Sequence, residues 1–142
     1  MSHPLHPALV HYPVACWTLA ALADFAGLAW HPDWLWPAAA GLAALGCAFG
    51  LLAAGAGLLE LARLGNGHPA TATALWHMLL ALTTWCVFAG SLVARVRGGA
   101  LVPPGTLVFV LDAAGLAGVL ATGWLGGTLV YRHGVGVGER AA

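Results

Sequence analysis

Four long, mostly apolar stretches, separated by three short polar breaks, are the feature that most limits what this chain can fold into. Each stretch reaches or exceeds the roughly 20 residues that a helix needs to cross a lipid bilayer. The 142 residues include only five basic and five acidic ones, 7% of the chain, whereas a soluble domain has about 25% charged residues. The apolar excess must therefore face lipid. We predict an all-α fold, an integral membrane four-helix bundle with helices over about residues 7–30, 35–64, 70–96 and 106–131.

The breaks between the apolar stretches are short, and they fall at residues 31–33, 65–69 and 98–104. Helices joined by short connections lie antiparallel beside each other, which predicts an up-down-up-down bundle and a single domain over residues 1–142. Both termini then lie on one side of the membrane, called side A below, and the other side is side B. We expect residues 134–142 to form a flexible tail. A β-barrel is disfavoured because the period-two alternation of its strands is absent.

Composition and spacing exclude several classes of function. The formal net charge is zero, so no basic patch points to nucleic acid. Cys16, Cys47 and Cys86 each lie within an apolar stretch and have no CxxC spacing, which favours a packing role over redox chemistry. No Ser-His-Asp or Cys-His arrangement stands at membrane depth, and we assign no catalytic residue.

The seven histidines are divided unequally between the two sides. His31 alone falls toward side B, and the six on side A are His3, His6, His11, His68, His77 and His133. At a rise of 1.5 Å per residue, His11 and Glu60 lie roughly 5 Å inside the membrane and His77 about 10 Å. Polar side chains at this depth face the interior of a bundle or a cavity. These three residues, from three different helices, therefore predict one interior cluster on side A.

Two motifs carry a resemblance to a known family. They are HPALVHYP at residues 6–13 and GWLGGTLVYRHGVGV at residues 123–137. With them the chain resembles the bacterial membrane proteins of the domain of unknown function 2231 (DUF2231) family over nearly its whole length. Glu60 and His77 stand where that family tends to carry an acid and a His, whereas Ala81 stands where it often has Asn. The resemblance implies four transmembrane helices. It also implies redox proteins as partners, because some relatives look fused to Rieske or c-type cytochrome domains.

The first hypothesis for the side A cluster is a membrane b-type haem protein with bis-His ligation that transfers electrons. Facing helices of a four-helix bundle can supply both axial imidazoles, and we expect them from His11 and His77, with His6 and His133 as a lower-ranked second pair. The predicted cofactor-binding residues are His11, His77, His6, His133, Arg132, Gly126 and Gly127. In this set the glycines leave room for the macrocycle and the arginine meets its propionates. Trp76 could pack against the same ring.

The second hypothesis is a transition-metal-binding or metal-transporting membrane protein. His6, His11, His77 and Glu60 would supply enough ligands for zinc, copper or nonhaem iron. Glu60 could instead orient a ligand histidine. A third hypothesis is a structural membrane subunit without a cofactor, in which these histidines contribute only to stability.

On side B, Asp24 and Asp112 fall at similar depth near Arg95 and Arg97. They form either an interfacial ion pair or part of a proton path. We expect the chain in the bacterial inner, or cytoplasmic, membrane, with the lipid bilayer around it. We place side A outward, toward a cytochrome c or Rieske partner, and a quinone is an alternative partner. The Gly-rich helices could also form a homodimer.

Overall fold

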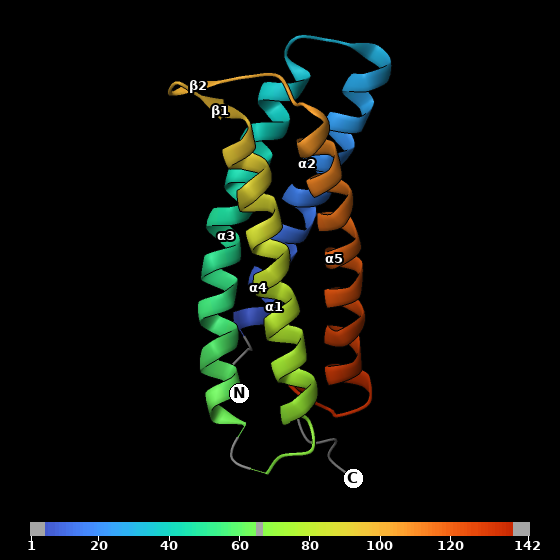
Figure 1. Cartoon of the computed structure of the whole chain (residues 1–142). Helices are drawn as coiled ribbons and strands as arrows, with labels where there is room; N and C mark the ends of the chain where they lie inside the picture. The colour runs from blue at the N-terminus through green and yellow to red at the C-terminus, as the bar shows by residue number, and fades with distance from the viewer. Residues whose placement is uncertain (1–4, 65–66, 138–142) are drawn as a thin grey trace.

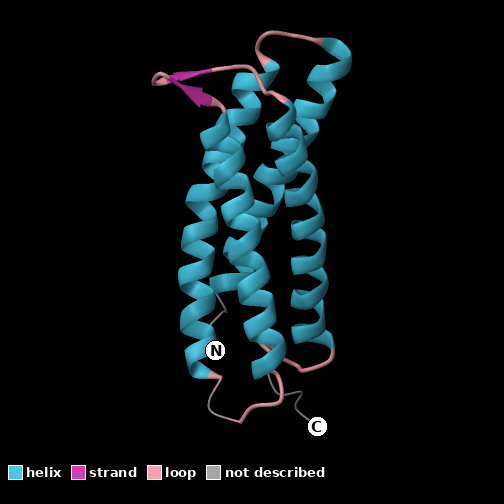
Figure 2. Ribbon diagram, viewed as in Figure 1, coloured by secondary structure: helices cyan, strands magenta, loops and turns pink. Residues whose placement is uncertain are grey.

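The computed structural model describes residues 5–64 and 67–137. Within these residues the elements are α1 (Leu5–Leu9), α2 (His11–Trp30), α3 (Leu35–Arg63), α4 (Thr71–Ala94), β1 (Val96–Arg97), β2 (Ala100–Leu101) and α5 (Thr106–Tyr131). The long helices stand side by side, and α1 begins and α5 ends toward the same end of the bundle (Figure 1). That end is side A, and the small hairpin lies at side B (Figure 2). The predicted all-α membrane bundle is confirmed.

Four helical segments are long and apolar enough to cross a membrane, namely Leu5–Trp30, Leu35–Arg63, Thr71–Ala94 and Thr106–Tyr131. Their outer faces carry large apolar side chains, and Leu19, Leu52 and Leu120 are 53%, 58% and 75% exposed. Soluble proteins rarely expose apolar surface on this scale. In a bilayer it faces hydrocarbon, while the helices satisfy their own backbone hydrogen bonds.

The N-terminal span is divided at Val10, between α1 and α2. Proline has no backbone N–H, so Pro13 cannot donate to the carbonyl of Leu9 as a helical residue at that position would. The helix therefore breaks one turn before Pro13, and α1 packs against α3.

The connection between α4 and α5 contains a β-hairpin that the sequence analysis did not predict. Val96 pairs with Leu101 and Arg97 with Ala100 in an antiparallel register. Gly98 and Gly99 form the turn, with φ angles of 59° and 81°. A two-residue hairpin turn of type I′ needs positive φ at both central positions, which glycine adopts without strain. α4 consequently ends at Ala94, two residues before the predicted end of that helix.

The core of the bundle is a layer to which all four long helices contribute. The indole of Trp17 (α2) stacks on the ring of Phe88 (α4), with centroids 5.0 Å apart and ring planes 3° apart. Gly46 of α3 lies directly against the indole, and Gly115 of α5 lies directly against the phenyl ring. A Cβ on Gly46 would lie 2.5 Å from Trp17, and one on Gly115 would lie 2.6 Å from Phe88. Two glycines are therefore what allows two large rings to stack between the helices.

Candidate functional site

A cavity of about 390 Å³ lies inside the side A half of the bundle. It is lined mainly by apolar side chains from every helix, and its polar lining includes His6, Glu60 and His77. Toward side B the lining stops at the level of Trp17, Trp85 and Val119. Since Trp17 belongs to the stacked core layer, aromatic rings form the floor of the cavity.

His6 is held in this cavity by three residues on one face of α3. Its Nδ1 lies 2.8 Å from the carbonyl oxygen of Ala53, and its backbone N–H donates to Glu60 Oε1 at 3.1 Å. Between these two residues lies Gly57, where a Cβ would come within 2.9 Å of His6 Nδ1. Ala53, Gly57 and Glu60 are spaced i, i+4 and i+7, so they form a single stripe along the helix.

His77, on α4, is held in the same manner by α5. Its Nδ1 lies 3.1 Å from the carbonyl oxygen of Thr122. Four residues further along α5 is Gly126, where a Cβ would lie 3.3 Å from His77 Cε1. The two histidines thus have matching surroundings, which we call imidazole seats: a helix carbonyl at position i and a glycine at position i+4 of the neighbouring helix.

The spacing of an imidazole seat has a physical reason. In an α-helix the carbonyl of residue i accepts the N–H of residue i+4, which leaves its second lone pair without a partner. The side chain at i+4 projects back over the preceding turn, close to that carbonyl. Glycine at i+4 removes this cover, so an imidazole from the next helix can reach the lone pair.

The seats also fix the tautomer of both rings. A carbonyl oxygen can only accept a hydrogen bond, so Nδ1 of His6 and Nδ1 of His77 each carry the proton and donate it. In a neutral imidazole the proton-free Nε2 then holds a lone pair. Neither Nε2 has a hydrogen-bond partner within residues 5–64 and 67–137. The ring centroids are 6.0 Å apart, and the ring planes meet at 87°.

The structure brings His6, and not His11, together with His77. His11 is the first residue of α2 and is exposed, and it does not line the cavity. The two histidines are five residues apart, which is roughly 140° around a helix at 3.6 residues per turn. Only one of them can therefore face the interior, and the residue that lines the cavity is His6. The pairing of His11 with His77 expected from the sequence is replaced by the pair His6 and His77.

The other predicted cofactor residues are spread over the side A end. Gly126 lies against the His77 ring, so its missing side chain makes room for an imidazole, whereas a Cβ on Gly127 would lie 3.9 Å from Tyr131. Arg132 is exposed and has no ion pair among the described residues. His133 lies 3.3 Å from Thr73 Oγ1 and does not line the cavity. The expected pairing of His6 with His133 is therefore not formed.

Glu60 lines the cavity, and the contact it makes there is with the backbone of His6. Within the described residues no group of three or more His, Cys, Asp or Glu side chains is arranged to hold one metal ion. The four-ligand set of His6, His11, His77 and Glu60 is thus reduced to two imidazoles. Glu60 was expected either to bind a metal or to orient a ligand histidine, and its observed partner is the backbone N–H of His6.

The chain folds back under the cavity after α5. Val135 N–H donates to the Leu129 carbonyl at 3.0 Å, and Gly134 N–H donates to the Val130 carbonyl at 3.1 Å. Gly134 has a φ of 65°, as in the glycine-terminated ends of many helices. Val135 and Gly136 then line the cavity. Residues 134–137 of the tail predicted to be flexible therefore form an ordered turn, and residues 138–142 lie outside the described part of the chain.

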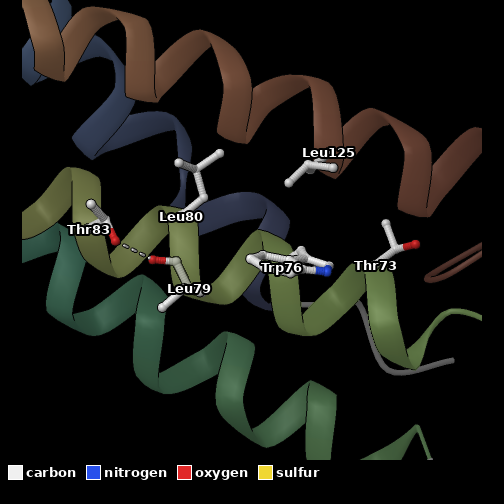
Figure 3. A pocket seen from close by; sticks show the side chains of 6 residues that line it. All are labelled: Thr73, Trp76, Leu79, Leu80, Thr83 and Leu125. Carbon is white, nitrogen blue, oxygen red and sulfur yellow. Dashed lines mark hydrogen bonds between the residues drawn. The ribbon is translucent and has the colours of Figure 1, made fainter.

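A second hollow, of about 370 Å³, lies along α4 and α5 on the outside of the bundle (Figure 3). Trp76 and Leu125 line it together with Thr73 and Thr83, and Thr83 donates to the carbonyl of Leu79 at 2.9 Å. Trp76 is 65% exposed. It therefore does not line the cavity that holds its neighbour His77. In this position Trp76 is not placed to pack against a ring cofactor in that cavity.

Comparison with known proteins gives a match to a family model. The family model described as "Predicted membrane protein (DUF2231)" matches residues 2–139. No curated protein and no solved structure matches the chain. The match confirms the resemblance carried by the two motifs at residues 6–13 and 123–137.

Proposed function

Because the chain belongs to the DUF2231 family of predicted membrane proteins, whose description states no activity, we propose a function from its site: a b-type haem protein that transfers electrons within the membrane. His6 and His77 would hold the iron of its haem. The observation that carries the proposal is the pair of imidazole seats. Inside one apolar cavity they leave the Nε2 of both rings without a hydrogen-bond partner among the described residues.

The separation of the two rings suits a shared metal centre. A metal–imidazole bond is about 2.0 Å long, and two such bonds in line, with half of each ring, place the ring centroids roughly 6 Å apart. The observed separation is 6.0 Å. Ligating histidines also typically donate their other ring nitrogen to a carbonyl or carboxylate, which fixes the ring and increases the basicity of the ligating nitrogen. Both seats have this arrangement.

The donor set and the cavity favour haem over a bare ion. Two imidazoles fill the two axial positions of haem iron, whereas a structural zinc site needs four protein ligands. Cofactor sites are mostly apolar cavities of about 300–1,000 Å³, and this cavity has about 390 Å³ and an apolar lining.

When bound, haem supplies reversible one-electron chemistry at its iron. The residues of this chain bind and orient the group. His6 and His77 would both bind its iron, which would leave no ligand position for oxygen and would favour electron transfer. The aromatic floor at Trp17 and Trp85 closes the cavity toward side B. Because the cavity lies in the side A half of the bundle, a partner at side A would exchange electrons with the site over the shorter distance.

An absorption spectrum of the detergent-purified protein, oxidised and then reduced with dithionite, tests the proposal. Cells are supplied with haem during expression. We expect a Soret band that shifts on reduction and resolved α and β bands. His6→Ala and His77→Ala should each abolish this spectrum, whereas His11→Ala should leave it unchanged. His11 is the matched control because it is a histidine in the same N-terminal span that does not line the cavity.

Two results would replace the proposal with an alternative. A featureless visible spectrum with zinc, copper or nonhaem iron found by elemental analysis, and lost in His6→Ala and His77→Ala, would establish a metal site. A featureless spectrum without bound metal, with both variants altered only in stability, would indicate a structural subunit. Loss of the haem spectrum in His11→Ala but not in His6→Ala would refute the ligand assignment.

The proposal extends to orientation and partners. We place the chain in the bacterial inner membrane with side A toward the periplasm, because the Rieske and c-type cytochrome domains that the family resemblance implies as partners function outside the cytoplasm. A cytochrome c, a Rieske protein or a quinone would then exchange electrons with the site. An alkaline phosphatase fusion at the C-terminus should be active, whereas an inactive phosphatase and a fluorescent green fluorescent protein fusion would place side A in the cytoplasm.

A further inference from the structure

A second group of polar side chains lies in the side B half of the bundle, beyond the stacked core layer. Arg95 follows α4 directly and is 0% exposed, and Asp24 (α2) and Asp112 (α5) are each 1% exposed. The Arg95 guanidinium donates to both oxygens of Asp24, with Nη1 to Oδ1 at 2.9 Å, and its Nη2 also donates to Asp112 Oδ2 at 3.1 Å. Ser91, 0% exposed, contacts Asp112 Oδ1 at 2.7 Å. The ion pair expected from the sequence is thus a buried cluster of four residues joining three helices.

The charges of this cluster do not balance if every group is ionised. One guanidinium faces two carboxylates, so the sum is one negative charge. α3 adds no compensating charge, because its side B half carries no ionisable residue other than Cys47. His31, Asp33 and Arg97 belong to connections at the side B end and are exposed. An uncompensated charge buried in a medium of low dielectric constant is costly, and the group neutralises instead.

We propose that the side B cluster is a proton-binding site, with one proton held on Asp112. The hydrogen bonds distinguish the two carboxyls. The guanidinium donates to both oxygens of Asp24, and this bidentate pairing is typical of an ionised carboxylate. Asp112 shares one nitrogen of that guanidinium and places its other oxygen against a hydroxyl. With the proton on Oδ1, the same 2.7 Å contact is made by the carboxyl O–H donating to Ser91 Oγ.

A second observation points to the same site. Arg95 Nε is buried and has no hydrogen-bond partner among the described residues. A buried N–H without an acceptor is uncommon in proteins. In this cluster it is a free donor beside a protonated carboxyl, so the group retains capacity for a small acceptor such as the water that delivers or removes the proton.

Infrared spectroscopy of the whole detergent-purified protein at neutral pH tests this proposal without reference to any cofactor. We expect a carbonyl stretching band of a protonated carboxylic acid that shifts on exchange into D₂O. The band should be absent from Asp112→Asn, which preserves the shape of the side chain. It should persist in Glu60→Gln, which removes the acid of the side A cavity. Thermal unfolding of each variant confirms that it is folded.

Ser91→Ala assigns the proton to one of the two carboxyls. Removing the hydroxyl should shift the band if Asp112 carries the proton, because Ser91 contacts Asp112 and not Asp24. Unfolding the protein in weakly buffered detergent should also release one proton more per chain from the wild type than from Asp112→Asn. Absence of the band in folded wild-type protein would overturn the proposal, as would a band that persists in Asp112→Asn. If sodium ions stabilise the protein and the infrared band is absent, a bound cation neutralises the cluster, and the proposal of a bound proton is wrong.

Discussion

Gly57→Ala tests whether the imidazole seat of α3 fixes the position of His6. The new Cβ would lie 2.9 Å from His6 Nδ1 and 3.1 Å from Cε1, where ordinary contact begins at 3.4 Å. The ring must therefore move away from α3 by about 0.5 Å or more. It cannot do so freely, because Nδ1 is bound to the Ala53 carbonyl at 2.8 Å and the backbone N–H to Glu60 at 3.1 Å.

The expected cost follows from these contacts. Weakening the Nδ1–carbonyl hydrogen bond costs about 0.5–1.5 kcal/mol, and introducing a methyl group into a packed contact typically costs about 1–3 kcal/mol. Against this, alanine is better than glycine in a helix by up to about 1 kcal/mol. We therefore expect Gly57→Ala to lower the free energy of unfolding by about 0.5–3.5 kcal/mol. Gly55→Ala is the matched control on the same helix, since nothing lies within 4 Å of its Cβ, and it should be neutral or slightly stabilising.

Two measurements check this reasoning. Reversible unfolding in mixed detergents gives the difference in stability between Gly57→Ala and Gly55→Ala. Nitrogen NMR of labelled imidazole reports the tautomer and hydrogen bond of His6, and its signal should change in Gly57→Ala alone. Equal stabilities together with an unchanged His6 signal would refute the seat as the element that positions this ring, whether or not haem is bound.

Two further predictions concern the rest of the bundle. Gly46→Ala should destabilise the protein by about 1–3 kcal/mol, because its Cβ would lie 2.5 Å from Trp17, and the indole is stacked on Phe88 on its other side. Gly41→Ala, with nothing within 4 Å of its Cβ, should have no such effect in the same unfolding assay. Equal effects of the two substitutions would contradict the close packing of Gly46 against the stacked rings. Arg95→Met should lower the free energy of unfolding by about 3–5 kcal/mol, because it leaves the Asp24 carboxylate buried without its partner. Adding Asp24→Asn to this variant should recover a large part of the lost stability. If it does not, the loss does not arise from the unpaired charge.

The two histidine seats show why part of the site could not be predicted. The sequence placed His6, His11, Glu60 and His77 at one end of the bundle from their distance to the helix ends. It did not decide between His6 and His11, because the apolar residues of these helices surround each helix on all sides and mark no inward face. The i and i+4 pairs Ala53–Gly57 and Thr122–Gly126 were present in the sequence. Their meaning depends on which helix lies alongside, which the sequence does not state.

The sequence by itself determined that this chain is a membrane protein with four spans, because stretches of this length and apolarity must be surrounded by the hydrocarbon of a bilayer. It also determined which polar groups share side A and which share side B, since short connections force the helices to alternate. Only the tertiary structure decided that His6 turns inward and that Arg95 is buried between Asp24 and Asp112. It also decided that the Nδ1 of both rings donates to a helix carbonyl, which leaves the proton off Nε2. These outcomes depend on the rotation of each helix about its axis, and close packing between neighbouring helices sets that rotation.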